Sequence, residues 1–91
     1  MNSRDKEILD ITQEECAEVI VAVSKISRFG LDNFKPGKPK TNRQHLAEEL
    51  GDLQCMIDLC VEHDLVDATK LQIYSQEKRQ KLKVWSNIDA L

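Results

Sequence analysis

Most of the residues that interrupt helices are gathered in one stretch of this chain. Residues 29 to 43, FGLDNFKPGKPKTNR, contain two of the three glycines and both prolines. Because glycine and proline favour turns and disrupt helices, this stretch is predicted to be a loop. The segments before and after it carry apolar residues at helical spacing. The chain is therefore expected to be all-α, with long helices on either side of the loop.

The first helix is predicted to begin near Asp5 or Asp10 and to end at about Arg28, where Phe29-Gly30 supplies a glycine at the C-cap position. Thr41 or Asn42 is expected to cap the second helix. At about 100° per residue, each helix has one apolar stripe that is expected to face the core. The stripe of the first helix contains Cys16, Val19, Ile20, Val23 and Ile26, and that of the second contains Leu46, Leu50, Leu53, Ile57 and Cys60.

A third helix is predicted after the break in the apolar pattern near residues 62 to 67. Asp67 is its expected N-cap, and it should run to about Trp85. Its apolar stripe is interrupted by a lysine and contains Leu71, Tyr74, Lys78, Leu82 and Trp85. Lys78 therefore either extends along its stem into water or faces a partly buried anion.

The chain is short enough that its core is expected to be small. Its 91 residues are predicted to form one domain, residues 1–91, near the size at which a single core is barely sufficient. A partner subunit is therefore expected. We predict three main helices per protomer, assembled into an oligomeric helical bundle that is a homodimer or a homotetramer.

Charge and hydropathy exclude several classes of protein. The pI of about 5.3 argues against nucleic acid as a partner. No apolar run approaches the roughly 20 residues that span a bilayer, and the N-terminal residues are too polar for a signal peptide. We expect no membrane partner and a cytoplasmic location. The three cysteines are odd in number and lie in apolar segments, so buried reduced thiols are expected at Cys16, Cys55 and Cys60.

Two acidic motifs of matching spacing lie in the first two predicted helices. EECAE occupies residues 14–18 and EELGD residues 48–52. On a helix, Glu15 lies one turn from Glu18, and Glu49 lies one turn from Asp52. Like charges at this spacing repel each other unless a cation lies between them. Because the two motifs hold six carboxylates and the whole chain carries −3, the remainder carries +3, so the acidity is local.

Each acid pair is predicted to border an apolar stripe, so antiparallel packing of the two helices would bring four carboxylates around one small volume. Oxygen ligands favour a hard divalent ion, Mg²⁺, with Mn²⁺ as a possible substitute. A di-iron site would need Glu-x-x-His pairs, which neither histidine provides. Cys60-x-x-His63 supplies only two ligands for zinc. No serine or cysteine lies in a recognisable nucleophile motif.

A Mg²⁺ ion with open coordination positions commonly binds phosphates. Basic residues would then hold the phosphate oxygens while a carboxylate or the metal polarises the attacking water. Candidates for these contacts are the cationic residues of the loop, together with Lys25, Arg28, Lys78 and Lys81. This combination predicts metal-assisted hydrolysis of a polyphosphate. The alternative from another class is a non-catalytic helical adaptor whose acidic residues face solvent or a basic partner.

The succession of EECAE, a linker, EELGD and the basic segment EKRQKLKVW resembles the all-α nucleoside triphosphate pyrophosphohydrolases of the MazG-like superfamily. QEECAEVIVAVSKISRFGLDN and HLAEELGDLQCMIDL are similar to the short stand-alone members often carried by bacteriophages. The resemblance covers roughly residues 11 to 85. It implies Mg²⁺-dependent cleavage between the α- and β-phosphates, which yields a nucleoside monophosphate and pyrophosphate. Phosphoribosyl-ATP hydrolysis is an enzymatic alternative within the same superfamily.

The resemblance also assigns roles to individual residues. It implies that Glu15, Glu18, Glu49 and Asp52 bind the metal. Glu14, and less strongly Glu48, would serve in catalysis with Glu15, by binding a further ion or positioning the water. Lys78 and Lys81 would contact phosphate from the basic C-terminal helix. Dimers or tetramers with sites at the subunit contacts are implied as well.

Overall fold

The computed structural model describes residues 1–91 and contains three α-helices and no strand. The predicted all-α fold with three main helices is therefore confirmed. In chain order the helices are α1 (Ser3–Phe29), α2 (Asn42–Glu62) and α3 (Ala68–Trp85).

Side-chain caps account for where each helix begins. α1 begins earlier than predicted, because the side chain of Asn2 accepts a hydrogen bond from the backbone N–H of Asp5. The predicted cap Thr41 is confirmed, and it forms a reciprocal capping box with Gln44 at the start of α2. Asp67 caps α3 as predicted. α1 ends at Phe29, and its C-cap is Gly30, as predicted, whose φ of 93° lies in a region that residues with a side chain rarely adopt.

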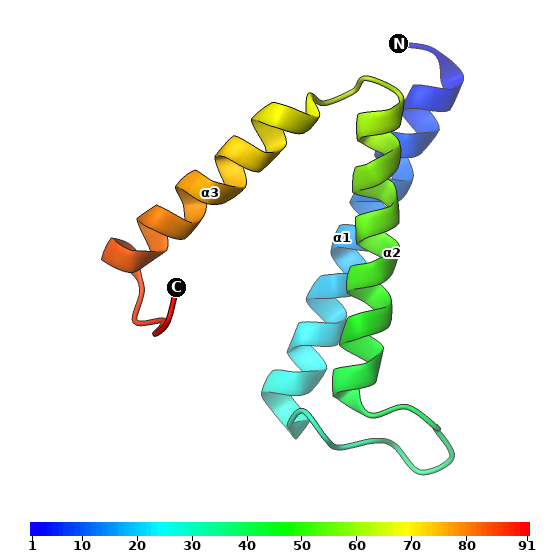
Figure 1. The fold of residues 1–91 in the computed structure, drawn as a ribbon. Coiled ribbons are helices and arrows are strands. Elements are labelled where there is room, and N and C mark those ends of the chain that lie inside the picture. The colour runs from blue at the N-terminus through cyan, green and yellow to red at the C-terminus, as the bar shows by residue number, and fades with distance from the viewer.

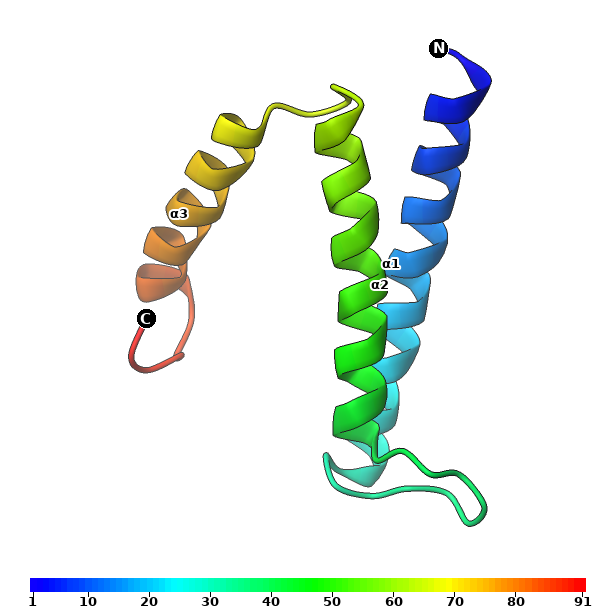
Figure 2. The same ribbon diagram turned by 45° about the vertical axis from the view of Figure 1, so that its right-hand side comes forward.

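The three helices form a single layer. α1 and α2 lie side by side in opposite directions, whereas α3 extends away from them (Figure 1, Figure 2). The Cα atoms span 44 × 37 × 14 Å, and the smallest extent is close to the roughly 10–12 Å diameter of one helix with its side chains. A stable domain normally packs two layers around its core. This protomer therefore leaves the faces of its layer uncovered.

The core of the protomer is small, as the sequence predicts. Only five of the 91 residues are buried. An apolar cluster lies between the N-terminal part of α1 and the C-terminal part of α2, at the end of the hairpin opposite the loop. It contains Ile8, Met56 and Cys60, with Ile11, Leu59 and Leu65 packed against it. Farther along α1, toward the loop, Ala22 is completely buried.

The predicted apolar stripe of α1 is only partly correct. Val19 and Ile26 lie on the face that packs against α2 and are half-buried. Cys16 is exposed, Ile20 is 70% exposed and Val23 is 49% exposed. The packed face is rotated toward Glu15 and Ala22 because α2 contacts only one flank of a broad apolar stripe. The other flank remains free on the outside of the hairpin.

α2 differs from its predicted stripe in the same way. Its buried residues are Glu49, Met56 and Cys60, whereas Leu50 is 47% exposed. In both helices, the predicted stripe residues that lie outside the α1–α2 contact are displaced from the packed face in the same direction of rotation about the helix axis. Because the helices are antiparallel, these two sets point to the same side of the layer. We call them the apolar flank, which consists of the exposed Cys16, Ile20 and Val23 of α1 and of the exposed Leu50 with the half-buried Leu46 and Ile57 of α2.

Two other expectations are corrected by the exposure of side chains. Of the three cysteines predicted to be buried, only Cys60 is buried, because Cys16 and Cys55 lie on outer faces of the hairpin. The apolar stripe predicted for α3 has no partner within the protomer. Its residues are exposed except for Leu82, which is half-buried. No helix combines the length and the apolar character that crossing a bilayer requires.

The packing of α1 against α2 can be tested at Ala22, which has no exposed surface. Ala22→Leu adds volume to a closed contact, and we expect it to lower the free energy of unfolding by about 1–3 kcal/mol. Ala47→Leu makes the same change at an exposed position of α2 and should stay within about 0.5 kcal/mol of the wild type. Urea unfolding followed by circular dichroism measures both. Equal stabilities of the two variants would contradict the observed packing.

Candidate metal centre

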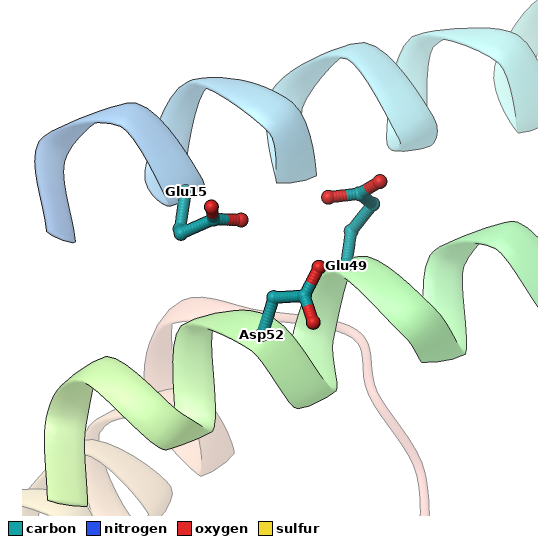
Figure 3. Close-up of side chains that lie close together, drawn as sticks. All are labelled: Glu15, Glu49 and Asp52. Carbon is teal, nitrogen blue, oxygen red and sulfur yellow. The ribbon is translucent and has the colours of Figure 1, made fainter. Parts of the chain in front are cut away.

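Three carboxylates from the two acidic motifs meet between α1 and α2 (Figure 3). Glu15 comes from α1, and Glu49 and Asp52 come from successive turns of α2. One carboxylate oxygen from each residue lies within 4.8 Å of the others. We call these three residues the acidic cluster.

The acidic cluster exists because two of its members occupy positions on the packed faces of their helices. Glu49 is 8% exposed and lies on the same face of α2 as Met56 and Cys60. Glu15 is half-buried and follows Ile8 and Ile11 along the packed face of α1. The sequence predicted these carboxylates at the edges of the apolar stripes. They lie farther inside, because both helices are rotated relative to the predicted stripes.

His45 adds a nitrogen to this region that the sequence analysis did not assign to the site. Its Nε2 lies 3.1 Å from Oε1 of Glu49, and both side chains are mostly shielded from solvent. The signal for this contact is present in the sequence, because residues four apart lie on the same face of a helix. The Glu-x-x-His spacing of a di-iron motif does not reveal it, because His45 precedes its carboxylate by four residues.

The electrostatics of Glu15 reflect its position in the acidic cluster. Its pKa is raised above the ordinary value of 4.5, first by desolvation and then by repulsion from Asp52, Glu49, Glu14 and Glu18. Each of these causes disfavours the ionised carboxylate. A divalent cation among the carboxylates would reverse this effect, because it attracts the charge that the neighbouring groups repel.

The donor set of the acidic cluster fits a hard divalent cation. All three candidate ligands are carboxylate oxygens, which Mg²⁺ and Mn²⁺ accept. Adjacent ligands of an octahedral Mg²⁺ ion lie roughly 3 Å apart, given Mg–O distances of about 2.0–2.1 Å. The 4.8 Å spread of the oxygens is wider, so binding one ion requires a small convergence of the side chains. Rotation about the flexible glutamate torsions provides such movement.

The remaining acidic candidates lie outside the acidic cluster. Glu18 is exposed, one turn along α1 from Glu15 and on the side of the layer opposite the apolar flank. Glu14 is also exposed. Glu48 forms an ion pair with Lys40 of the loop instead of joining the other carboxylates. The structure therefore brings together three of the four predicted metal ligands, and of the three predicted catalytic residues only Glu15.

Among the basic residues proposed to contact substrate, Lys25 and the loop residues Lys35, Lys38 and Lys40 line a cavity at the loop end of the hairpin. The guanidinium of Arg28 stacks on the ring of Phe29, 4.8 Å from its centroid. Lys78 and Lys81 lie on α3, which makes almost no contact with the α1–α2 hairpin. Within one protomer, therefore, α3 does not deliver its lysines to the acidic cluster.

Comparison with known proteins gives no identification of this chain. No protein-family description, no curated protein and no solved structure matches it. Any function must therefore be argued from the residues and their arrangement.

The repulsion within the acidic cluster predicts a pH-dependent stability. A carboxylate whose pKa is raised by folding destabilises the fold while it is ionised, and this cost disappears as the pH falls below its ordinary value of 4.5. Glu15→Gln cannot ionise at this position. We therefore expect it to melt at a higher temperature than the wild type at pH 7 in EDTA, with the difference shrinking toward pH 4. Melting curves between these pH values test this.

The matched control for this experiment is Glu77→Gln, which removes one exposed carboxylate from α3, away from the acidic cluster. It should leave the melting temperature nearly unchanged at both pH values. A Glu15→Gln variant that melts below the wild type at pH 7 would show that the ionised carboxylate stabilises the fold, contrary to the argument.

Proposed function

We propose that this protein is a Mg²⁺-dependent hydrolase that converts nucleoside or deoxynucleoside triphosphates to the nucleoside monophosphate and pyrophosphate. The observation that carries the proposal is the convergence of Glu15, Glu49 and Asp52 between α1 and α2. Carboxylates are rarely placed within a helix contact unless a partner compensates their charge. The resemblance to MazG-like enzymes, which rests on the two acidic motifs, supplies the reaction.

In this proposal the acidic cluster holds the metal. Glu15 reaches the ion from α1, while Glu49 and Asp52 reach it from adjacent turns of α2, so the ion stabilises the packing of the two helices. When bound, Mg²⁺ would neutralise charge on the phosphate oxygens and favour ionisation of the attacking water. Glu18 and Glu14 lie on the same side of the layer, and we assign to them a further ion or the orientation of the water.

Assembly into an oligomer is part of the proposal, because the protomer leaves its apolar flank uncovered. The flank contains Ile20 and Leu50 among other large exposed side chains, and it lies on the side of the layer opposite Glu18. A second copy that packs the same flank against it would form a two-layer, four-helix arrangement. Such assembly would also offer a partner for the exposed apolar side chains of α3, and it could bring Lys78 or Lys81 of one subunit near another subunit's acidic cluster.

The oligomer is tested by adding a charge to the apolar flank. We expect the wild type to sediment as a dimer or tetramer at micromolar concentration and Ile20→Glu to sediment mainly as a monomer, because burial of the new carboxylate is unfavourable. Gln80→Glu adds the same charge at an exposed polar position of α3 and serves as the control. Sedimentation velocity distinguishes these states. A wild type that remains monomeric at high concentration would refute this part of the proposal.

The reaction is tested by incubating the protein with each common NTP and dNTP in the presence of Mg²⁺ and measuring pyrophosphate. We expect pyrophosphate and monophosphate as the products, and a loss on the order of a hundredfold in Glu49→Gln and in Asp52→Asn, a size typical for removal of one electrostatic group from a catalytic site. Glu62→Gln, at the exposed end of α2, should retain activity. Orthophosphate as the sole product would indicate a different cleavage position. Activity on phosphoribosyl-ATP alone would indicate the alternative within the superfamily.

The adaptor alternative predicts a different response to metal. If the acidic cluster binds Mg²⁺, the folded state gains about 2.7 kcal/mol when the free ion is at a hundredfold excess over its dissociation constant. The melting temperature of the wild type should then rise with Mg²⁺, and that of a Glu15→Gln, Asp52→Asn double variant should not. A wild type that shows no metal response and no hydrolysis would favour the adaptor.

A further inference from the structure

A second charged site lies at the loop end of the hairpin, next to the acidic cluster but of opposite sign. A cavity of about 420 Å³ is lined by seven residues, none of them acidic or hydrophobic. We call it the lysine cavity. Its lining comes from α1, from the loop and from the first turn of α2, and consists of Lys25, Lys35, Lys38, Pro39, Lys40, Asn42 and His45.

Most of the positive charge of the lysine cavity is uncompensated. Lys40 forms an ion pair with Glu48, whereas Lys25, Lys35 and Lys38 form no ion pair in the structure. Like charges gathered around a concave surface repel each other and raise the local concentration of anions. The cavity therefore favours an anion with several charges over one with a single charge.

The loop that carries three of these lysines has a defined conformation. Asp32 forms two hydrogen bonds with the guanidinium of Arg43, at 3.0 and 3.3 Å. The hydrogen bonds from Arg43 and then its positive charge lower the pKa of Asp32, so the pairing favours the ionised carboxylate. The backbone N–H of Asn42 donates to the carbonyl of Asn33 at 2.9 Å, and that of Lys38 donates to Lys35 at 3.0 Å. These bonds close the loop at its base and turn it at its tip.

His45 links the lysine cavity to the acidic cluster. It lines the cavity and also contacts Glu49, which follows it by four residues, about 6 Å along the helix axis at ~1.5 Å per residue. Because His45 borders both sites, a phosphate chain held by a metal ion at the acidic cluster would begin close to the lysine cavity. The backbone N–H groups in the first turn of α2 contribute little to anion binding, because they already donate to carbonyl groups of the loop and to the side chain of Thr41.

We propose that the lysine cavity binds the two terminal phosphates of the triphosphate and holds them as pyrophosphate after cleavage. The assignment of the ligand as a nucleotide rests on the proposed function, whereas the preference for a multiply charged phosphate chain rests on the cavity alone. With the cavity occupied by the β- and γ-phosphates, the α-phosphate lies toward the metal. Water then attacks the α-phosphorus and gives up a proton to solvent, the bond between the α-phosphorus and the bridging oxygen breaks, and pyrophosphate leaves with the bridging oxygen while the water oxygen stays on the monophosphate.

The proposal is tested by calorimetric titration of inorganic pyrophosphate into the full-length protein in EDTA, without any divalent ion. We expect the wild type to bind pyrophosphate and to bind orthophosphate much more weakly. A Lys35→Gln, Lys38→Gln variant should bind pyrophosphate about tenfold more weakly, since it loses two of the charges that contact the anion. Lys70→Gln, Lys83→Gln makes the same change in charge on α3 and should bind as the wild type does.

Enzyme kinetics distinguish an error in the proposed lysine cavity from an error in the proposed reaction. If the wild type hydrolyses triphosphates, we expect KM and the inhibition constant for pyrophosphate to be about tenfold higher in the Lys35→Gln, Lys38→Gln variant. Its melting temperature should be unchanged, because both side chains are exposed. If this variant hydrolyses triphosphates with an unchanged KM and an unchanged inhibition constant for pyrophosphate, the proposed role of the lysine cavity is refuted and the proposed reaction stands. Pyrophosphate binding that depends on these lysines, in a protein that hydrolyses no nucleotide, would support the cavity and refute the proposed reaction.

Discussion

The contact between α1 and α2 contains carboxylates at positions where a two-helix contact would normally place apolar side chains. Glu15 and Glu49 lie on the packed faces, between the apolar cluster around Met56 and the buried Ala22. Desolvation, and then repulsion from Asp52 and Glu49, raises the pKa of Glu15, and both effects oppose the packing that the apolar cluster favours. The stability of the α1–α2 hairpin therefore depends on a group or ion that compensates the negative charge of these carboxylates.

The two sides of the helical layer differ in character for the same reason. Because α1 and α2 contact each other through a face that includes acidic residues, part of each apolar stripe is left on one side of the layer, where Ile20 and Leu50 are exposed. The other acidic residues and the lysine cavity lie on the opposite side. One side of the layer is thus apolar and the other is charged, so the assembly and the ligand binding that we propose would use different surfaces.

Local sequence signals predicted the three helices and most of their ends, whereas the structure was needed for the start of α1 and for the face that each helix packs against its neighbour. Thr41, Asp67 and Gly30 act through neighbours within a few residues, so their effects were predictable. The exposure of Cys16 and Ile20 depends on where α2 packs, because the apolar stripe of α1 is wider than the face that one neighbouring helix covers. The spacing of the acidic motifs predicted that carboxylates would meet, but it did not distinguish Glu49, inside the contact, from Glu48, which pairs with Lys40. The lysine cavity depends on the path of the loop, which composition does not specify.

Opposite charges lie close together on this hairpin without neutralising each other, and that separation has a structural cause. Direct pairing of the loop lysines with the acidic cluster would relieve the repulsion at both sites. The Asp32–Arg43 clamp instead holds the base of the loop, Lys40 pairs with Glu48, and His45 both lines the lysine cavity and contacts Glu49. A surface that keeps an anionic and a cationic site one helical turn apart complements a ligand of the reverse polarity. A divalent cation attached to a phosphate chain has that polarity, with the cation at one end and the uncompensated phosphate charge at the other.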